Sequence, residues 1–205
     1  MQLPNMARAI PAAAAFLLTA AAMAHAEYPY SGYWDNPDEG TSMEDVARHC
    51  ALSFVEQRDD GHYNTYVLDK EAFTSRGEVT YLRYASGVCT FKEDSQVESC
   101  HSLVDLTSPG DQTYLVFNVL TAIKPDRVEF AAFGSMDGAR SAIRDGTVAD
   151  DGNTGALVRC PVSPDLLQSH TRGQLMNGTA DDITALTNRG DDGLADEVLK
   201  TLTGQ

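Results

Sequence analysis

The sequence predicts an α+β fold: an N-terminal helix, an antiparallel β-meander of about six to eight strands, and short C-terminal helices. The meander is expected to form a sheet or a partly closed barrel. Helical periodicity covers residues 42–56, β-branched and aromatic residues dominate from His62 to about Cys160, and helical patterns return after Pro161. The turns between the β segments are short, which requires antiparallel neighbours because parallel strands need a long crossover.

Residues 1–26 have the features of a bacterial-type signal peptide. The leader carries Arg8 and no acidic residue, and an apolar run follows from Ala12 to Ala24. Ala24-His25-Ala26 is an A-x-A cleavage site. The run is shorter than the roughly 20 residues that span a bilayer. We therefore expect a mature chain that begins at Glu27, is periplasmic or secreted, and has no membrane insertion after signal cleavage; an uncleaved hydrophobic helix is the alternative.

Residues 27–41 are expected to form an extended aromatic arm, because they contain prolines and tyrosines without any period. Two interpretations of the rings remain open. They wrap around the body and are buried, or Tyr30, Tyr33 and Trp34 form a binding surface for a sugar or peptide.

Residues 42–162 are expected to form the main domain, stapled by disulfides. Its helix is predicted over 42–56, where Thr41 and Glu44 have the spacing of a capping box. Apolar residues recur at spacings of three and four, and Cys50 is on that buried stripe. Six strands are predicted, with 139–148 and 156–160 as further edge strands. The six segments are 62–68, 78–84, 88–92, 97–106, 113–123 and 127–133.

Residues 163–205 are expected to form a helical tail that packs on the same domain. Short helices are predicted over 164–175, 180–187 and 194–202, separated by turns that contain glycine.

The four cysteines predict two disulfides, because an even count in an exported chain favours pairing. Residues 87–101 look like a hairpin that places Cys89 opposite Cys100. Cys50 and Cys160 then pair by elimination and close a loop of about 110 residues. No C-x-x-C spacing is present, which argues against a zinc site and a thioredoxin-like role. Both disulfides are therefore interpreted as structural.

The formal net charge of −15 makes this an acidic protein and argues against partners with phosphate backbones or anionic lipid surfaces. We therefore expect that the protein does not bind nucleic acid. The charge instead favours cations, basic peptides or a basic protein as partners. Plain solubility of the chain explains the same charge without any partner.

Motifs with a specific chemistry are not found. The segment 134–138 resembles a G-x-S-x-G elbow, but its serine is one position early, and the histidines do not have the H-E-x-x-H spacing. No catalytic residue is assigned. No cofactor is predicted other than calcium, at a weak loop formed by Asp150, Asp151 and Asn153, which lacks the full EF-hand series.

Gly32-Tyr33-Trp34 matches the G-x-W of lipocalins, which are secreted β-barrels with small apolar ligands. The match covers three residues, and a capped helix follows where the first long strand should continue. The chain is therefore not assigned to that family, although a ligand-holding barrel stays among the expected architectures.

These observations predict an exported, non-catalytic binding or accessory module of the bacterial envelope, whose partner is a protein or a small ligand. One alternative is a periplasmic hydrolase with a site assembled in space. The other is a structural protein stabilised by calcium.

Overall fold

A computed structural model describes residues 28–92, 96–104, 112–174 and 191–204. The predicted signal peptide and the helix expected over 180–187 lie outside these residues. Among the described residues, no helix is long and apolar enough to cross a bilayer.

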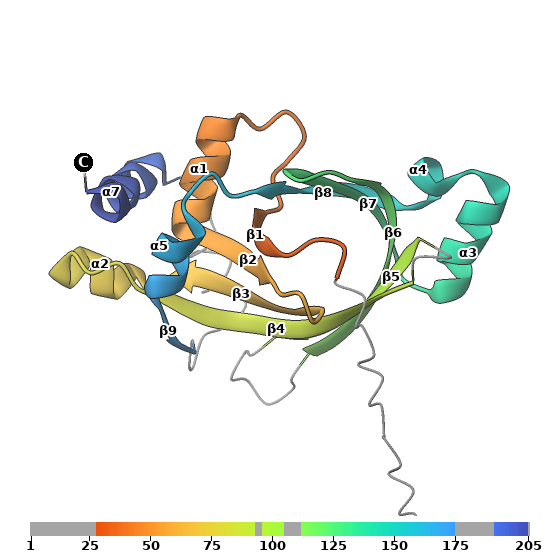
Figure 1. The fold of residues 1–205 in the computed structure, drawn as a ribbon, viewed down its shortest axis with the longest axis horizontal. Coiled ribbons are helices and arrows are strands. Elements are labelled where there is room, and N and C mark those ends of the chain that lie inside the picture. Colours follow the sequence, from red (N-terminus) through yellow and green to blue (C-terminus); the bar gives the residue numbers. More distant parts are fainter. Residues whose placement is uncertain (1–27, 93–95, 105–111, 175–190, 205) are drawn as a thin grey trace, which may run out of the picture.

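Eight antiparallel strands form a closed barrel (Figure 1). Each strand pairs with the next one along the chain, and β8 pairs with β1 to close the ring. The strands are β1 Gly32–Asp35, β2 Ser53–Gln57, β3 His62–Leu68, β4 Tyr81–Lys92, β5 Val97–Val104, β6 Gln112–Ile123, β7 Arg127–Phe133 and β8 Asn153–Arg159. A further strand, β9 Thr171–Gln174, pairs parallel to β4. The predicted meander is thus a complete barrel.

The helices lie outside the barrel on two sides. Figure 1 shows α1, α2, α5 and α7 to the left of the strands, and α3 and α4 to the right. Their bounds are α1 Met43–Leu52, α2 Lys70–Arg76, α3 Met136–Asp145, α4 Val148–Asp151, α5 Pro164–Ser169 and α7 Asp192–Thr203. Each of the two longer internal helices, α1 and α3, begins after a serine whose hydroxyl accepts a backbone N–H bond, as an N-cap should.

The prediction that a helix opens the fold is not supported, because β1 precedes α1. Part of the segment expected to be an extended arm is therefore a barrel strand. The helix expected over 42–56 begins after Ser42, whose Oγ accepts from the Asp45 amide at 3.1 Å, and it ends at Leu52. Its last predicted residues form β2 instead, since Val55 pairs with Trp34 in the ladder between β1 and β2. Tertiary pairing overrides the local helical period here.

The edge strand expected over 139–148 is wrong, because these residues lie mainly in α3. Ser135 caps this helix, and Ala139 and Ala142 are buried at a helical spacing of three. The helix expected over 164–175 is also shorter: α5 ends at Ser169, and β9 follows.

The hydrophobic core consists of one cluster inside the barrel and two clusters on its outer face. This division follows from the alternation of side chains along each strand. Tyr33 and Phe54 face α1 and α7 in the helix-covered cluster, so their neighbours Trp34 and Val55 face the barrel interior. A smaller cluster lies between the outer face of β5–β7 and α3. The interior cluster is defined by Tyr28, Tyr30, Trp34, Cys89, Cys100, Leu120 and Val128.

Two disulfides cross-link the chain, one of them over a long range and the other within a hairpin. Cys50 of α1 is bonded to Cys160, which follows β8, and Cys89 is bonded to Cys100 across β4 and β5. Cys89 and Cys100 are directly paired in the strand register, as the predicted hairpin requires.

Candidate functional site

One end of the barrel opens into a pocket of about 1190 Å³, here called the mouth pocket. Its walls come from the arm at Tyr28 and Pro29, the β2–β3 turn at Asp59 and Asp60, residues 88–91 of β4, Gln96, and residues 120–123 of β6. These segments meet because β2, β4 and β6 all end at the same rim of an antiparallel barrel. The arm before β1 (red in Figure 1) crosses the ring of strands beside this pocket.

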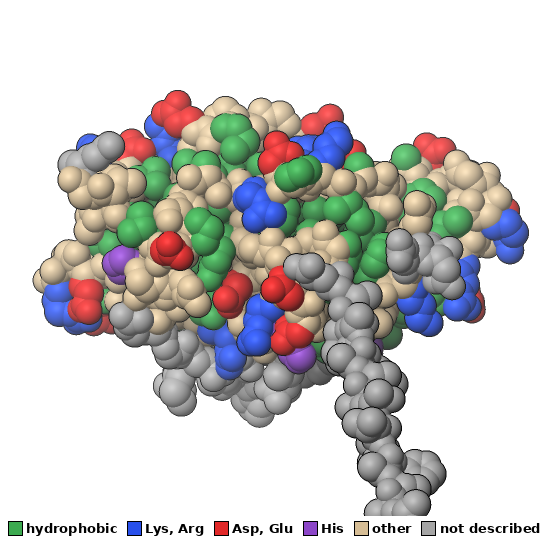
Figure 2. Space-filling view, in the orientation of Figure 1, with side chains coloured by type: hydrophobic (Ala, Val, Ile, Leu, Met, Phe, Trp, Pro, Cys, Tyr) green, Lys and Arg blue, Asp and Glu red, His purple; other side chains and the backbone are tan. Residues whose placement is uncertain are grey.

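The mouth pocket presents apolar side chains to solvent. Val88 and Ile123 line it and are 36% and 44% exposed. On the face drawn in Figure 2, hydrophobic side chains gather over the middle of the molecule, with acidic and basic groups among them. Such a pocket suits a ligand with a substantial apolar body.

A buried carboxyl group lies in the barrel wall behind the pocket. Glu98 of β5 is 1% exposed. The Tyr30 hydroxyl donates to its Oε1 at 2.8 Å, and Asn118 Nδ2 donates to its Oε2 at 2.9 Å. Burial raises the pKa of Glu98 to about 7, although the hydrogen bond from Asn118 opposes the shift. Glu98, Tyr30 and Asn118 are called the Glu98 triad below.

The Cys89–Cys100 disulfide adjoins this triad. The two sulfurs and a Glu98 oxygen all lie within 4.8 Å of one another, and Asn118 Nδ2 also contacts Cys100 Sγ at 3.8 Å. In the described part of the chain, this is the one group of three His, Cys, Asp or Glu ligand atoms that converges. Because both sulfurs are bonded to each other, they are not available as thiolate ligands for a metal.

The interior contains polar atoms that no described residue satisfies. Within the part of the chain that the structure describes, the Tyr28 hydroxyl, Trp34 Nε1 and Asn118 Oδ1 are buried without a hydrogen-bond partner. Since buried polar groups are nearly always paired, this concentration in one cluster distinguishes the interior from an ordinary apolar core.

The Gly32-Tyr33-Trp34 triplet has a clear structural role. The guanidinium of Arg159 lies 4.3 Å from the centre of the Trp34 ring, and its Nη2 donates to the Ser31 carbonyl. Gly32 has a φ of +126°, and a Cβ there would collide with that guanidinium. Glycine and tryptophan together therefore let Arg159 fasten the β1–β8 seam.

The expected aromatic surface is not exposed. Tyr30 and Trp34 are buried in the interior cluster, and Tyr33 is buried in the helix-covered cluster, where its hydroxyl donates to Glu56. Of the two interpretations of these rings, burial describes the structure. Tyr30 still takes part in the site, through Glu98 rather than through a surface contact.

The segment expected to form a calcium loop has a different structure. Asp150 and Asp151 belong to the short helix α4, where the Thr147 hydroxyl donates to Asp151, and Asn153 begins β8. These three residues therefore lie at a helix-to-strand junction rather than in an irregular loop, and calcium binding there stays a prediction.

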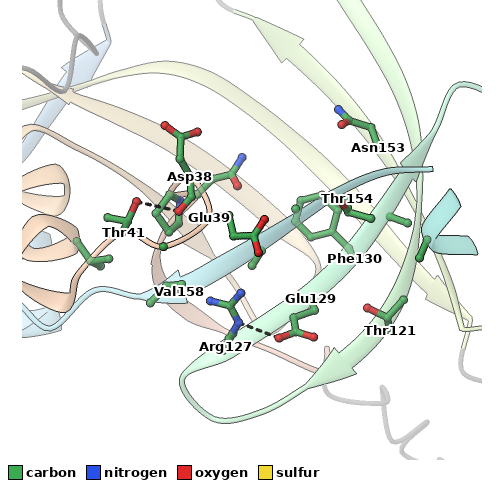
Figure 3. A pocket seen from close by; sticks show the side chains of 18 of the residues that line it. Asp38, Glu39, Thr41, Thr121, Arg127, Glu129, Phe130, Asn153, Thr154 and Val158 are labelled. Atoms are coloured by element: carbon green, nitrogen blue, oxygen red, sulfur yellow. Dashed lines mark hydrogen bonds and ion pairs between the residues drawn. The ribbon is translucent and has the colours of Figure 1, made fainter. Parts of the chain in front are cut away.

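Asn153 instead lines a second hollow, an outer groove of about 700 Å³ beside β7 and β8. Figure 3 shows Asp38 and Glu39 on one side of it and the ion pair between Arg127 and Glu129 on the other. Its lining contains more charged residues than that of the mouth pocket, together with apolar residues such as Phe130 and Val158.

Glu98 and Asn118 are functional candidates that sequence reasoning missed. A signal for Glu98 was present, because it lies two residues before Cys100 and therefore shares its strand face. If the side chain of Cys100 points into the barrel, the side chain of Glu98 points there too. Predicting that Asn118 lies beside Glu98 would have required the register of β5 with β6, in which the two residues are paired.

No protein-family model, curated protein or solved structure matches the chain. Its function is therefore argued from the geometry of the site.

Proposed function

We propose that this chain is an exported, non-catalytic binding protein that holds a small, largely apolar ligand in the mouth pocket. The observation that carries the proposal is the pocket itself: it is large enough for a small molecule, and it exposes Val88 and Ile123. The two disulfides are compatible with export to the periplasm or beyond.

The charges around the pocket favour a ligand without an anionic group near the rim. Asp59 and Asp60 stand there, and the whole chain has a net charge of −15. A neutral ligand, or one with a positively charged end, avoids the repulsion that an anionic ligand would meet.

A titration of the mature chain with Nile red, a neutral apolar dye, tests this proposal. Ile123→Asp places a charge in the pocket wall and should weaken dye binding roughly tenfold, since it replaces apolar contact with a charge that must stay hydrated. Ile143→Asp is the matched control, because Ile143 is also an exposed isoleucine but lies on α3, away from the pocket.

Equal dye affinity in the wild-type chain and Ile123→Asp, or equal weakening in both variants, would contradict the mouth pocket as the site. Trp34 adds a second signal. It is the single tryptophan of the chain and is buried in the interior cluster, so its emission reports whether the ligand perturbs the interior.

A further inference from the structure

We infer that the Cys89–Cys100 disulfide is a thiol–disulfide exchange site for a small-molecule thiol. The thiol enters the mouth pocket and attacks Cys89 Sγ, and Cys100 leaves with a proton from Glu98. This activity goes beyond ligand binding and does not depend on the identity of an apolar ligand.

The mouth pocket distinguishes the two cysteines of this disulfide, which are otherwise similarly buried, at 6% and 7% exposed. Cys89 lines the mouth pocket, whereas Cys100 is its partner on the neighbouring strand β5. A thiol in the pocket therefore meets Cys89 first. The other disulfide is placed differently: Cys50 and Cys160, at 0% and 6% exposed, both lie in the helix-covered cluster.

Asn118 favours Cys100 as the leaving group. Its Nδ2 contacts Cys100 Sγ at 3.8 Å, so the amide can donate to the sulfur as negative charge develops there. Exchange is faster when the leaving thiolate is better stabilised. The geometry thus assigns different roles to the two cysteines: Cys89 receives the incoming sulfur, and Cys100 departs.

Glu98 supplies the proton. A carboxyl oxygen of Glu98 lies within 4.8 Å of both sulfurs, and burial raises its pKa to about 7. Such a carboxyl group is partly protonated near neutral pH, which suits a general acid. Once it has lost its proton, the Tyr30 hydroxyl and the Asn118 amide both donate to the carboxylate. These two groups, together with the disulfide, are the polar neighbours that face Glu98 in its contacts.

The step balances in atoms and electrons. The incoming thiolate forms a new S–S bond to Cys89, and the Cys89–Cys100 bond breaks with its electron pair on Cys100 Sγ. The proton of Glu98 converts that thiolate to a thiol and leaves a carboxylate. One disulfide replaces another, so only the thiol itself is needed as a co-reactant. Attack by Cys100 on the mixed disulfide reverses the step.

The test exposes the folded mature chain, with both disulfides intact, to 2-mercaptoethanol in the absence of denaturant. Samples are quenched with acid, and peptide mass spectrometry locates the adducts. We expect the mixed disulfide on Cys89, and we expect Cys89–Cys100 to open at least roughly tenfold faster than Cys50–Cys160. Adducts on Cys100, or equal opening of both disulfides, would overturn the inference.

Glu98→Gln tests the proton donor, because it keeps the size of the side chain, and its amide oxygen can still accept from Tyr30 or Asn118. Opening should slow roughly tenfold or more. Glu56→Gln is the matched control: Glu56 also accepts from tyrosine hydroxyls and an asparagine amide, at a site built from β1, β2 and β3. An opening rate unchanged in Glu98→Gln, or slowed equally in Glu56→Gln, would contradict the role of Glu98.

The wild-type chain provides a check that needs no variant. Divided by the thiolate concentration of the reagent, the opening rate should fall as pH rises through about 7, because Glu98 then loses the proton that it donates. A flat profile would contradict the mechanism. Loss of dye binding in Ile123→Asp with normal exchange, or the reverse, separates this inference from the proposed ligand site.

Discussion

The two disulfides of this protein have contrasting surroundings. Cys50–Cys160 lies in the helix-covered cluster, where apolar residues of α1, α5 and α7 pack against the outside of the barrel. Cys89–Cys100 lies inside the barrel, next to the Glu98 carboxyl group and the wall of the mouth pocket. One bond ties distant segments together, and the other joins neighbouring strands that already pair.

The difference shows that the same covalent bond can have separate roles according to what surrounds it. A disulfide that closes a long loop in an apolar setting contributes mainly stability. A disulfide that closes a short hairpin contributes less, because it restricts the unfolded chain less. For such a disulfide, the polar neighbours and the position at a pocket are more important than the length of the loop that it closes. The predictions below test this contrast.

The largest effect is expected on removing the long-range disulfide. Cys50→Ser with Cys160→Ser opens a sequence separation of 110 residues and should lower the free energy of unfolding by about 5 kcal/mol. Cys89→Ser with Cys100→Ser opens a separation of only 11 residues and should cost about 3 kcal/mol. Urea unfolding followed by circular dichroism measures both. A larger loss in the second double variant would reverse the contrast.

Much of the barrel could be predicted from the sequence, because its signals are local. The hairpin around Cys89 and Cys100 and the alternating strands 62–68 and 127–133 follow from residue type and turn chemistry alone. Barrel closure could not, because it depends on β1 pairing with β8, two segments that are more than a hundred residues apart. The segment 139–148 was predicted as an edge strand, whereas Ala139 and Ala142 are buried at a helical spacing in α3.

The site was less predictable than the fold. Pairing Cys89 with Cys100 needed only the hairpin, whereas finding the Glu98 triad needed the arm, β5 and β6 together. Tyr30 was noticed as an aromatic residue, but its partner is 68 positions away along the chain. Sequence patterns report which face a residue occupies, but not which distant side chain meets it there.

The pH dependence of stability should separate the two regions next. The pKa of Glu98 is about 7 in the folded chain and 4.5 for the ordinary side chain. Between these values the unfolded chain loses its proton first, so the free energy of unfolding should fall by about 3 kcal/mol as pH rises from 4.5 to 7. Glu98→Gln should remove this fall.

The measurement is urea unfolding at closely spaced pH values. Glu56→Gln serves as the control and should keep the same fall as the wild-type chain, because Glu98 is intact in it. A fall of equal size in Glu98→Gln would show that another group causes it.

Close packing around the interior cluster gives a smaller effect. At Gly87, an added Cβ would lie 2.6 Å from the Tyr63 ring and against the backbone carbonyl of His101, which cannot move aside. At Gly155, it would lie 2.8 Å from the edge of the Phe130 ring. We expect Gly87→Ala to lower stability by about 2–3 kcal/mol and Gly155→Ala by about 1 kcal/mol. Thermal unfolding compares the stability of the two variants. The opposite order would mean that the barrel wall adjusts to an added methyl group more easily at Gly87 than at Gly155.

The helix caps should show the smallest effect and the sharpest local contrast. Ser42 caps α1 and Ser135 caps α3, so replacing either with alanine should cost about 1 kcal/mol. The two helices differ in their anchoring, because Cys50 fixes α1 covalently to Cys160. Hydrogen exchange should therefore detect local opening of α3 in Ser135→Ala, whereas α1 in Ser42→Ala should stay protected near Cys50. Equal local opening of both helices would mean that the long-range disulfide acts on the unfolded chain alone.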